Sequence, residues 1–134
     1  MPGIRIAKLM DKVELERRTK AFALRVMRFI AAWPKNKVAD VLGYQLLKSG
    51  TSIGANYREA NRAESRPDFI HKTCTERSRS IGLVEKEAAE TQYWLELCEE
   101  ASIGDPDERQ WLLRESGELL AIFTSIGKTT KSRG

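Results

Sequence analysis

Residues suited to a protein core recur at alternating spacings of three and four in four separate segments of this chain. In the first segment, 11–33, the pattern runs through Leu15, Thr19, Phe22, Val26, Phe29 and Trp33. This period places the residues on one face of an α-helix that packs in a bundle. Pro34 disfavours helical geometry in the residue before it and therefore ends this helix.

Three further segments show the same period, and we predict helices over 37–61, 67–101 and 107–126, followed by a basic tail over 127–134. Their expected inner faces are Val38, Leu42, Leu46, Ser49, Ile53 and Tyr57 in the second helix, Ile81, Val84, Ala88, Thr91, Leu95 and Cys98 in the third, and Leu112, Ser116, Leu119, Phe123 and Ile126 in the fourth. Short connections between four amphipathic helices favour an up-down-up-down antiparallel bundle. The chain is predicted to be all-α, with residues 1–134 in a single domain.

The second predicted helix is unusual because it contains Gly43, Gly50 and Gly54. Each glycine costs about 1 kcal/mol relative to alanine inside a helix. Either a neighbouring helix approaches closely at these positions, or the helix breaks near Gly50.

Composition fits one folded domain outside the membrane. Hydrophobic residues make up 41% of the 134 residues, enough to fill one core. No apolar run approaches the roughly 20 residues that span a bilayer, and the first residues lack a secretory signal, so we expect a cytoplasmic protein. Cys74 and Cys98 fall within one predicted helix, about 36 Å apart at ~1.5 Å per residue, too far for a disulfide.

The sequence offers little for catalysis. His71 is the single histidine, the cysteines have no CxxC spacing, and the segment SGTSIG lacks the GK[ST] ending of a phosphate-binding loop. We therefore expect no catalytic residues, no metal site and no cofactor.

Charge is distributed unevenly. Residues 1–80 hold 17 Lys and Arg against 8 Asp and Glu, whereas residues 81–134 hold 6 against 11, although the whole chain carries only +4. This asymmetry suits a polyanionic partner on the basic part, or head-to-tail self-association in which a basic face meets an acidic one.

Basic side chains cluster in the first two predicted helices and just after them. Arginine offers paired donors to phosphate, and such clusters bind a nucleic-acid backbone without reading its sequence. The candidate nucleic-acid-binding residues are Arg17, Arg18, Lys20, Arg25, Arg28, Lys48, Arg58, Arg62 and Arg66.

A polar stripe on the second predicted helix comprises Gln45, Ser52, Asn56 and Glu59, at spacings of seven, four and three. These residues fall on one helical face beside the core. The stripe is either a buried hydrogen-bond network that sets bundle or subunit register, or a ligand or nucleotide contact.

Three runs carry a family resemblance: SGTSIGANYREANRAESRPDFIHK, VEKEAAETQYWLELCEEA and LLAIFTSIGKT. The chain resembles the four-helix-bundle family of 23S rRNA intervening-sequence proteins, related to the accessory variability determinant of diversity-generating retroelements. The most specific match is the pattern S-I-x-A-N-x-x-E, which falls on Ser52, Ile53, Ala55, Asn56 and Glu59.

This resemblance implies a ring-shaped homopentamer without catalytic activity. The retroelement relatives have a basic surface that binds nucleic acid, RNA or DNA. Their protein partner is a reverse transcriptase. The sequence therefore leads to a nucleic-acid-binding oligomer. The alternative is a self-assembling scaffold that docks a protein partner such as a reverse transcriptase and does not itself bind nucleic acid.

The segment from Thr73 to Ser80 departs from the family pattern, which runs directly from Phe-Ile-His-Lys to the Ile-Gly stretch that begins here at Ile81. Without these eight residues, Phe69 would join Ile81 and Val84 on one stripe. With them, the stripe must pass through Arg77. Eight residues rotate a helix by roughly 80° from its original phase, so the third helix must bulge, break or lengthen. Because the segment is polar, we expect it to be solvated.

Overall fold

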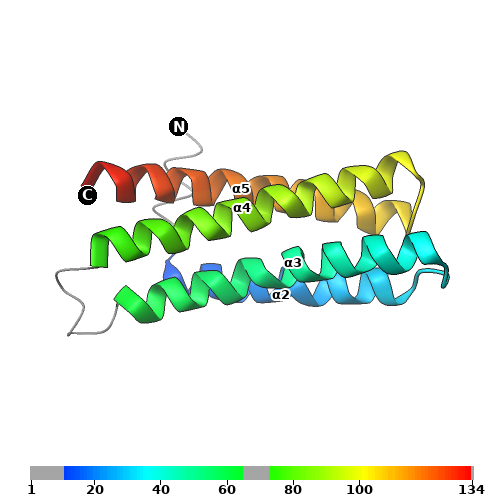
Figure 1. Cartoon of the computed structure of the whole chain (residues 1–134), viewed down its shortest axis with the longest axis horizontal. Coiled ribbons are helices and arrows are strands. Elements are labelled where there is room, and N and C mark those ends of the chain that lie inside the picture. The colour runs from blue at the N-terminus through cyan, green and yellow to red at the C-terminus, as the bar shows by residue number, and fades with distance from the viewer. Residues whose placement is uncertain (1–10, 65–72, 134) are drawn as a thin grey trace.

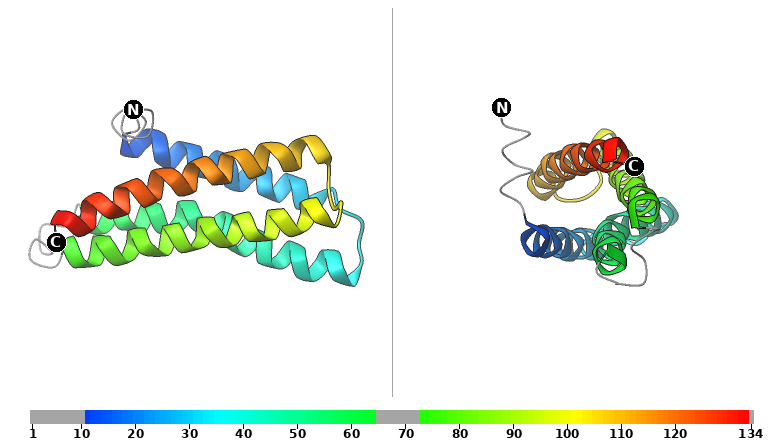
Figure 2. Two further views of the ribbon diagram at one scale, coloured as in Figure 1. Left: turned by 90° about the horizontal axis from the view of Figure 1, so that it is seen from above. Right: turned by 90° about the vertical axis from the view of Figure 1, so that its left-hand side faces the viewer.

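The computed structural model describes residues 11–64 and 73–133, which form four long helices (Figure 1). They are α2 (Lys12–Ala31), α3 (Lys37–Glu64), α4 (Thr73–Glu100) and α5 (Pro106–Arg133). Consecutive helices run antiparallel and surround one core, as the end-on view in Figure 2 shows. The predicted all-α, up-down four-helix bundle is confirmed. No helix in the described residues combines the length and apolar character that crossing a membrane requires.

The predicted core stripes are buried with few exceptions. All six stripe residues of the first helix and all six from Ile81 to Cys98 are buried, as are Leu46, Ser49, Ile53 and Tyr57 of α3. The assignment of Val38 to the core is wrong, because this residue is 65% exposed and Ala39 is buried in its place. Asn36 explains the register: its side-chain oxygen accepts a 2.8 Å hydrogen bond from the Ala39 amide and so caps the start of α3.

The glycines of α3 lie where α2 approaches most closely. A Cβ atom added at Gly43 would lie 3.1 Å from Ile30, one at Gly50 would lie 3.2 Å from Val26, and one at Gly54 would lie 3.0 Å from Thr19. The helix is continuous through Gly50. Close packing between α2 and α3 therefore explains these glycines, and the alternative of a broken helix is wrong.

Two expected segments differ in the structure. The fourth helix does not end at 126 as predicted, because α5 continues through the basic segment to Arg133. The segment 73–80 lengthens α4 by two turns and does not bulge or break. Arg77 occupies the inner stripe with only 18% of its side chain exposed, because it forms an ion pair with Glu64 of α3. The expectation of a solvated insertion is therefore wrong at Arg77. The predicted start of this helix, 67–72, lies outside the described residues.

Candidate nucleic-acid interface

A groove of about 310 Å³ runs between the outer surfaces of α2 and α3. Its cations are Lys20 from α2 and Arg58 and Arg62 from α3, all exposed. The floor is made of small residues: Ala23, Thr51, Gly54 and Ala55. The close approach of the two helices at Gly54 thus leaves a shallow channel with three positive side chains at its rim.

The groove also contains two carboxylates, Glu16 and Glu59. Glu16 is held in place, because the Asn61 amide donates a 2.8 Å hydrogen bond to it and Arg58 lies 3.6 Å away. Glu59 is exposed on the outer side of α3. The Glu16 charge is partly offset by Arg58. Among the residues that the structure describes, Lys20 and Arg62 are the two groove cations that form no ion pair with a carboxylate.

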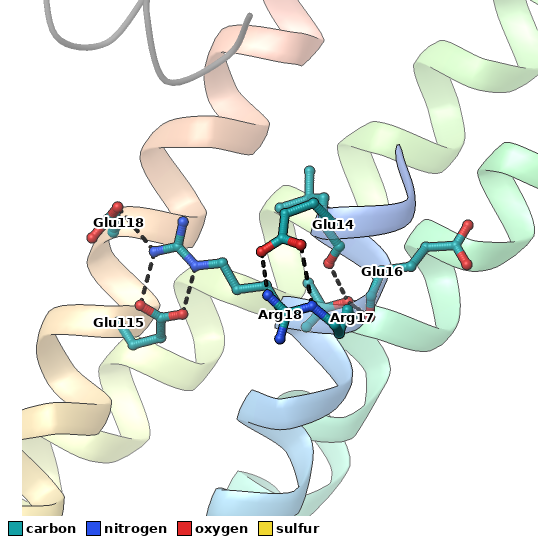
Figure 3. A network of polar contacts seen from close by, with 8 residues as sticks. Glu14, Glu16, Arg17, Arg18, Glu115 and Glu118 are labelled. Carbon is teal, nitrogen blue, oxygen red and sulfur yellow. Dashed lines mark hydrogen bonds and ion pairs between the residues drawn. The ribbon is translucent and has the colours of Figure 1, made fainter. Parts of the chain in front are cut away.

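Other predicted cations point toward α5 and not toward the groove. The Arg18 guanidinium donates hydrogen bonds of 2.7 and 2.8 Å to Glu115 and lies 2.9 Å from Glu118 (Figure 3). These carboxylates raise the pKa of Arg18 above its ordinary value. The adjacent residue, Arg17, is exposed and pairs with Glu14 of its own helix.

Arg25 makes a second bridge to α5. It hydrogen bonds to Glu108 and its guanidinium lies 3.5 Å from the centre of the Trp111 ring. The carboxylate and the aromatic ring together hold this cation against α5. Arg18 and Arg25 therefore stabilise the seam between α2 and α5, and the structure separates them from Lys20, Arg58 and Arg62.

The remaining predicted cations are dispersed. Arg28 and Lys48 are exposed, on α2 and α3 respectively, and Arg66 lies outside the described residues. Lys48 lies near Glu87 of α4, whose pKa is raised by burial and by Glu90, an effect that Lys48 partly opposes.

The polar stripe lies on the outer part of α3, and its last residue, Glu59, lines the α2–α3 groove. Gln45, Ser52 and Asn56 are half-buried and Glu59 is exposed. The Ser52 hydroxyl donates to the carbonyl of Lys48 within the same helix. A buried polar contact joins α3 and α4 outside this stripe: the Thr91 hydroxyl donates a 2.9 Å hydrogen bond to the Ser49 hydroxyl.

Sequence reasoning missed the groove's anchoring residues, Glu16 and Asn61. Their spacing from the cations carries a usable signal, because Arg58, Asn61 and Arg62 lie within about one turn of a helix. Within the described residues, no three His, Cys, Asp or Glu side chains are placed to hold a metal ion, and His71 lies outside them.

The sequence profile of the 23S rRNA-intervening sequence proteins matches residues 11–125, which contain α2, α3 and α4 and most of α5. The chain belongs to the 23S rRNA-intervening sequence protein family. It is also similar to a crystal structure from Bacteroides thetaiotaomicron, a protein of unknown function from the S23 ribosomal protein family. The two are 32% identical over 87% of this chain and 97% of that chain, with a TM-score of 0.70. No curated protein matches the chain.

The family pattern recognised in the sequence maps onto the groove and the core beneath it. Of its residues, Ile53 is fully buried, whereas Ala55 and Glu59 line the groove. In this member of the 23S rRNA-intervening sequence protein family, the most recognisable stretch of sequence thus shapes the α2–α3 contact and its outer surface.

Proposed function

We propose that this chain is a non-catalytic nucleic-acid-binding protein that works as a ring-shaped homopentamer. The observation that carries the proposal is the convergence of Lys20, Arg58 and Arg62 on one groove. Arginine and lysine neutralise phosphates of a nucleic acid. The counterions that the nucleic acid then releases provide much of the binding affinity. Membership of the 23S rRNA-intervening sequence protein family supports the same direction.

The composition of the groove favours contact with the backbone of a nucleic acid and not with its bases. No aromatic side chain lines the groove in the described residues, so there is no platform on which a base would stack. The floor of small residues lets a phosphate approach the helices. We therefore propose binding that depends little on sequence, to RNA or DNA.

A salt titration of affinity tests the proposal. Fluorescence anisotropy with labelled RNA and DNA of equal length should show the logarithm of the binding constant falling steeply with the logarithm of salt concentration. Changing Arg58 and Arg62 together to glutamine should weaken binding and reduce the slope by about two, since each lost phosphate contact removes roughly one unit.

Arg114→Gln is the matched control, because Arg114 is exposed on α5 away from the groove. This variant should bind as the wild-type chain does. Absence of binding at low salt, or equal losses in the groove variant and the control, would contradict the groove as a binding site.

The ring of five copies is proposed from the family resemblance and from the uneven charge of the chain. Light scattering should give about five times the 15.2 kDa mass of one chain. A single-chain mass across the micromolar range would contradict this part of the proposal.

The competing function is a scaffold that docks a protein partner such as a reverse transcriptase, the partner implied by a relation to retroelement accessory proteins. The exposed apolar residues Leu24, Met27 and Tyr44 favour it, because such surfaces commonly contact proteins. Affinity capture from the native cell, with and without nuclease, separates the two functions. A protein partner retained after nuclease treatment, with no nucleic acid recovered, would favour the scaffold.

A further inference from the structure

The cationic groove between α2 and α3 continues along the same pair of helices toward the α2–α3 turn. Thr51 of α3 lines the groove, and Leu47, one helical turn earlier, lines a second hollow of about 370 Å³. On α2, Lys20 lines the groove and Ile30 lines the hollow, with exposed Met27 between them on one stripe of the helix. The two depressions therefore lie end to end along one seam, which we call the α2–α3 seam.

An exposed aromatic ring stands at the second hollow. Among the residues that the structure describes, two aromatic residues are exposed, Tyr44 at 63% and Tyr93 at 53%. The Tyr93 ring packs edge-on against Trp94, with ring centres 5.0 Å apart. The Tyr44 ring, which lines the hollow, packs against no other aromatic ring in the described part of the chain. Tyr44 therefore presents its ring to solvent at the edge of the seam.

Tyr44 shares a face of α3 with the cationic groove. Tyr44, Thr51 and Arg58 follow one another at intervals of seven residues, or about two helical turns, so they lie on one stripe. At ~1.5 Å per residue, Tyr44 and Arg58 are about 21 Å apart along the helix. Beside Arg58, Lys20 and Arg62 form no ion pair with a carboxylate in the described residues. The seam thus has cations at one end and an exposed aromatic ring at the other.

The two ends of the seam suit different parts of a nucleotide. Lys35 and Asp40, of opposite charge, both line the hollow, so the end with Tyr44 has no excess of positive charge for a phosphate. Its surface is largely apolar, with Leu47 and exposed Met27 near the ring. Proteins that bind single-stranded nucleic acid combine a cationic groove for the backbone with aromatic rings on which bases stack. The seam has both features.

We propose that the α2–α3 seam binds single-stranded nucleic acid, with phosphates at Lys20, Arg58 and Arg62 and a base stacked on Tyr44. This inference rests on the proposed function and specifies its substrate class. Every base has an aromatic face, so stacking on one ring keeps the binding tolerant of sequence. A duplex can meet the cations, but its bases are already stacked on one another and must leave the helix to reach a side chain.

Tyr44→Leu tests the stacking contact, because leucine keeps an apolar side chain and removes the ring. Affinity for a labelled single-stranded RNA of about 16 nucleotides should fall at least about fivefold, the lower end of the loss for one stacked base. The slope of log affinity against log salt should stay at the wild-type value, since no phosphate contact is lost. A duplex of the same length should bind the variant and the wild-type chain equally. Tyr44→Phe should bind the single strand as the wild-type chain does.

Tyr93→Leu is the matched control, because it removes the other exposed tyrosine, which lies on α4 and outside the seam. It should bind the single strand with wild-type affinity. A strand of the same length that lacks its bases gives a second measurement, and the wild-type chain and Tyr44→Leu should bind this abasic strand equally. Positions 44 and 93 are both exposed, so circular dichroism should show wild-type helicity for all three variants.

The outcomes distinguish this inference from the proposed function. Absence of binding to every probe at low salt would overturn both. Salt-dependent binding that Tyr44→Leu leaves unchanged would overturn the stacking contact and leave the groove as a nucleic-acid site, with Tyr44 open to a protein partner. A loss in Tyr44→Leu that is equal for the single strand, the duplex and the abasic strand would likewise overturn the stacking contact, because it would not depend on accessible bases.

Discussion

Arg18 on α2 and Glu115 on α5 are joined by two parallel hydrogen bonds, of 2.7 and 2.8 Å, across 97 positions of sequence. Only 15% of the arginine side chain and 13% of the glutamate side chain are exposed. Glu118 adds a second carboxylate to the same guanidinium. Together with the ion pair between Arg25 and Glu108, this bridge connects α2 and α5, the first and last helices that the structure describes.

Replacing Arg18 by methionine should destabilise the fold by about 2–3 kcal/mol, because a largely buried carboxylate loses its charged hydrogen-bond donor. Arg17→Met is the adjacent control. Arg17 is mostly exposed and pairs with Glu14 on its own helix, so its loss should cost less than about 1 kcal/mol. Urea unfolding of both variants measures the difference. Equal costs would show that the α2–α5 bridge contributes no more than an exposed ion pair.

The glycines of α3 and α4 give a paired prediction of opposite sign. Gly54→Ala should destabilise the chain by about 1–3 kcal/mol, because the added Cβ would lie 3.0 Å from the Thr19 hydroxyl. That hydroxyl donates to the Leu15 carbonyl within buried α2, which limits its movement. Gly82→Ala should instead stabilise it by up to about 1 kcal/mol, since nothing lies within 4 Å of the added atom. Thermal unfolding should move in opposite directions for the two variants.

The helical period predicted the fold because burial in a bundle follows directly from spacing along each helix. It could not assign the cations, since spacing alone does not show which neighbour a side chain faces. Arg18 and Arg25 are seven residues apart on α2, and their partners Glu115 and Glu108 are seven apart on α5. That matched spacing on antiparallel helices was the available signal for an ion-paired seam. Arg77 was misjudged because its partner, Glu64, comes from another helix.

The Cys98 thiol should react slowly with alkylating reagents in the folded protein. Its side chain is fully buried, and burial raises the pKa of the thiol to about 11 from an ordinary value of 9.0. Because the pKa of Cys98 is higher in the folded than in the unfolded chain, its contribution to the free energy of unfolding is fully present below the ordinary pKa. This contribution is lost as the pH rises toward 11. In a Cys74→Ser variant, labelling at neutral pH should be slow until denaturant is added. Rapid labelling of the native protein would contradict the burial of Cys98.

The turn between α4 and α5 depends on Arg109, whose side chain is almost fully buried. One nitrogen, Nη1, donates to the carbonyls of Ile103 and Gly104 at 3.0 and 2.9 Å, and Nε donates to Glu99 at 2.7 Å. Arg109→Met should cost about 3 kcal/mol by leaving these acceptors without a charged donor. Arg109→Lys should recover only part of that loss, because an ammonium cannot reproduce the fork of the guanidinium.

The same contact predicts how stability depends on acid. The hydrogen bond from Arg109 lowers the pKa of Glu99 below its ordinary value. A lowered carboxyl pKa stabilises the fold above the unfolded value of about 4.3, and this contribution disappears as the pH falls through the lower folded value. Melting temperatures from pH 7 to pH 3 should therefore show Glu99→Gln less stable than wild type at neutral pH, with the gap closing in acid. Glu96→Gln, at an exposed position on the same helix, should show no such convergence. A gap for Glu99→Gln that stays constant down to pH 3 would mean that its ionisation is not coupled to folding through Arg109.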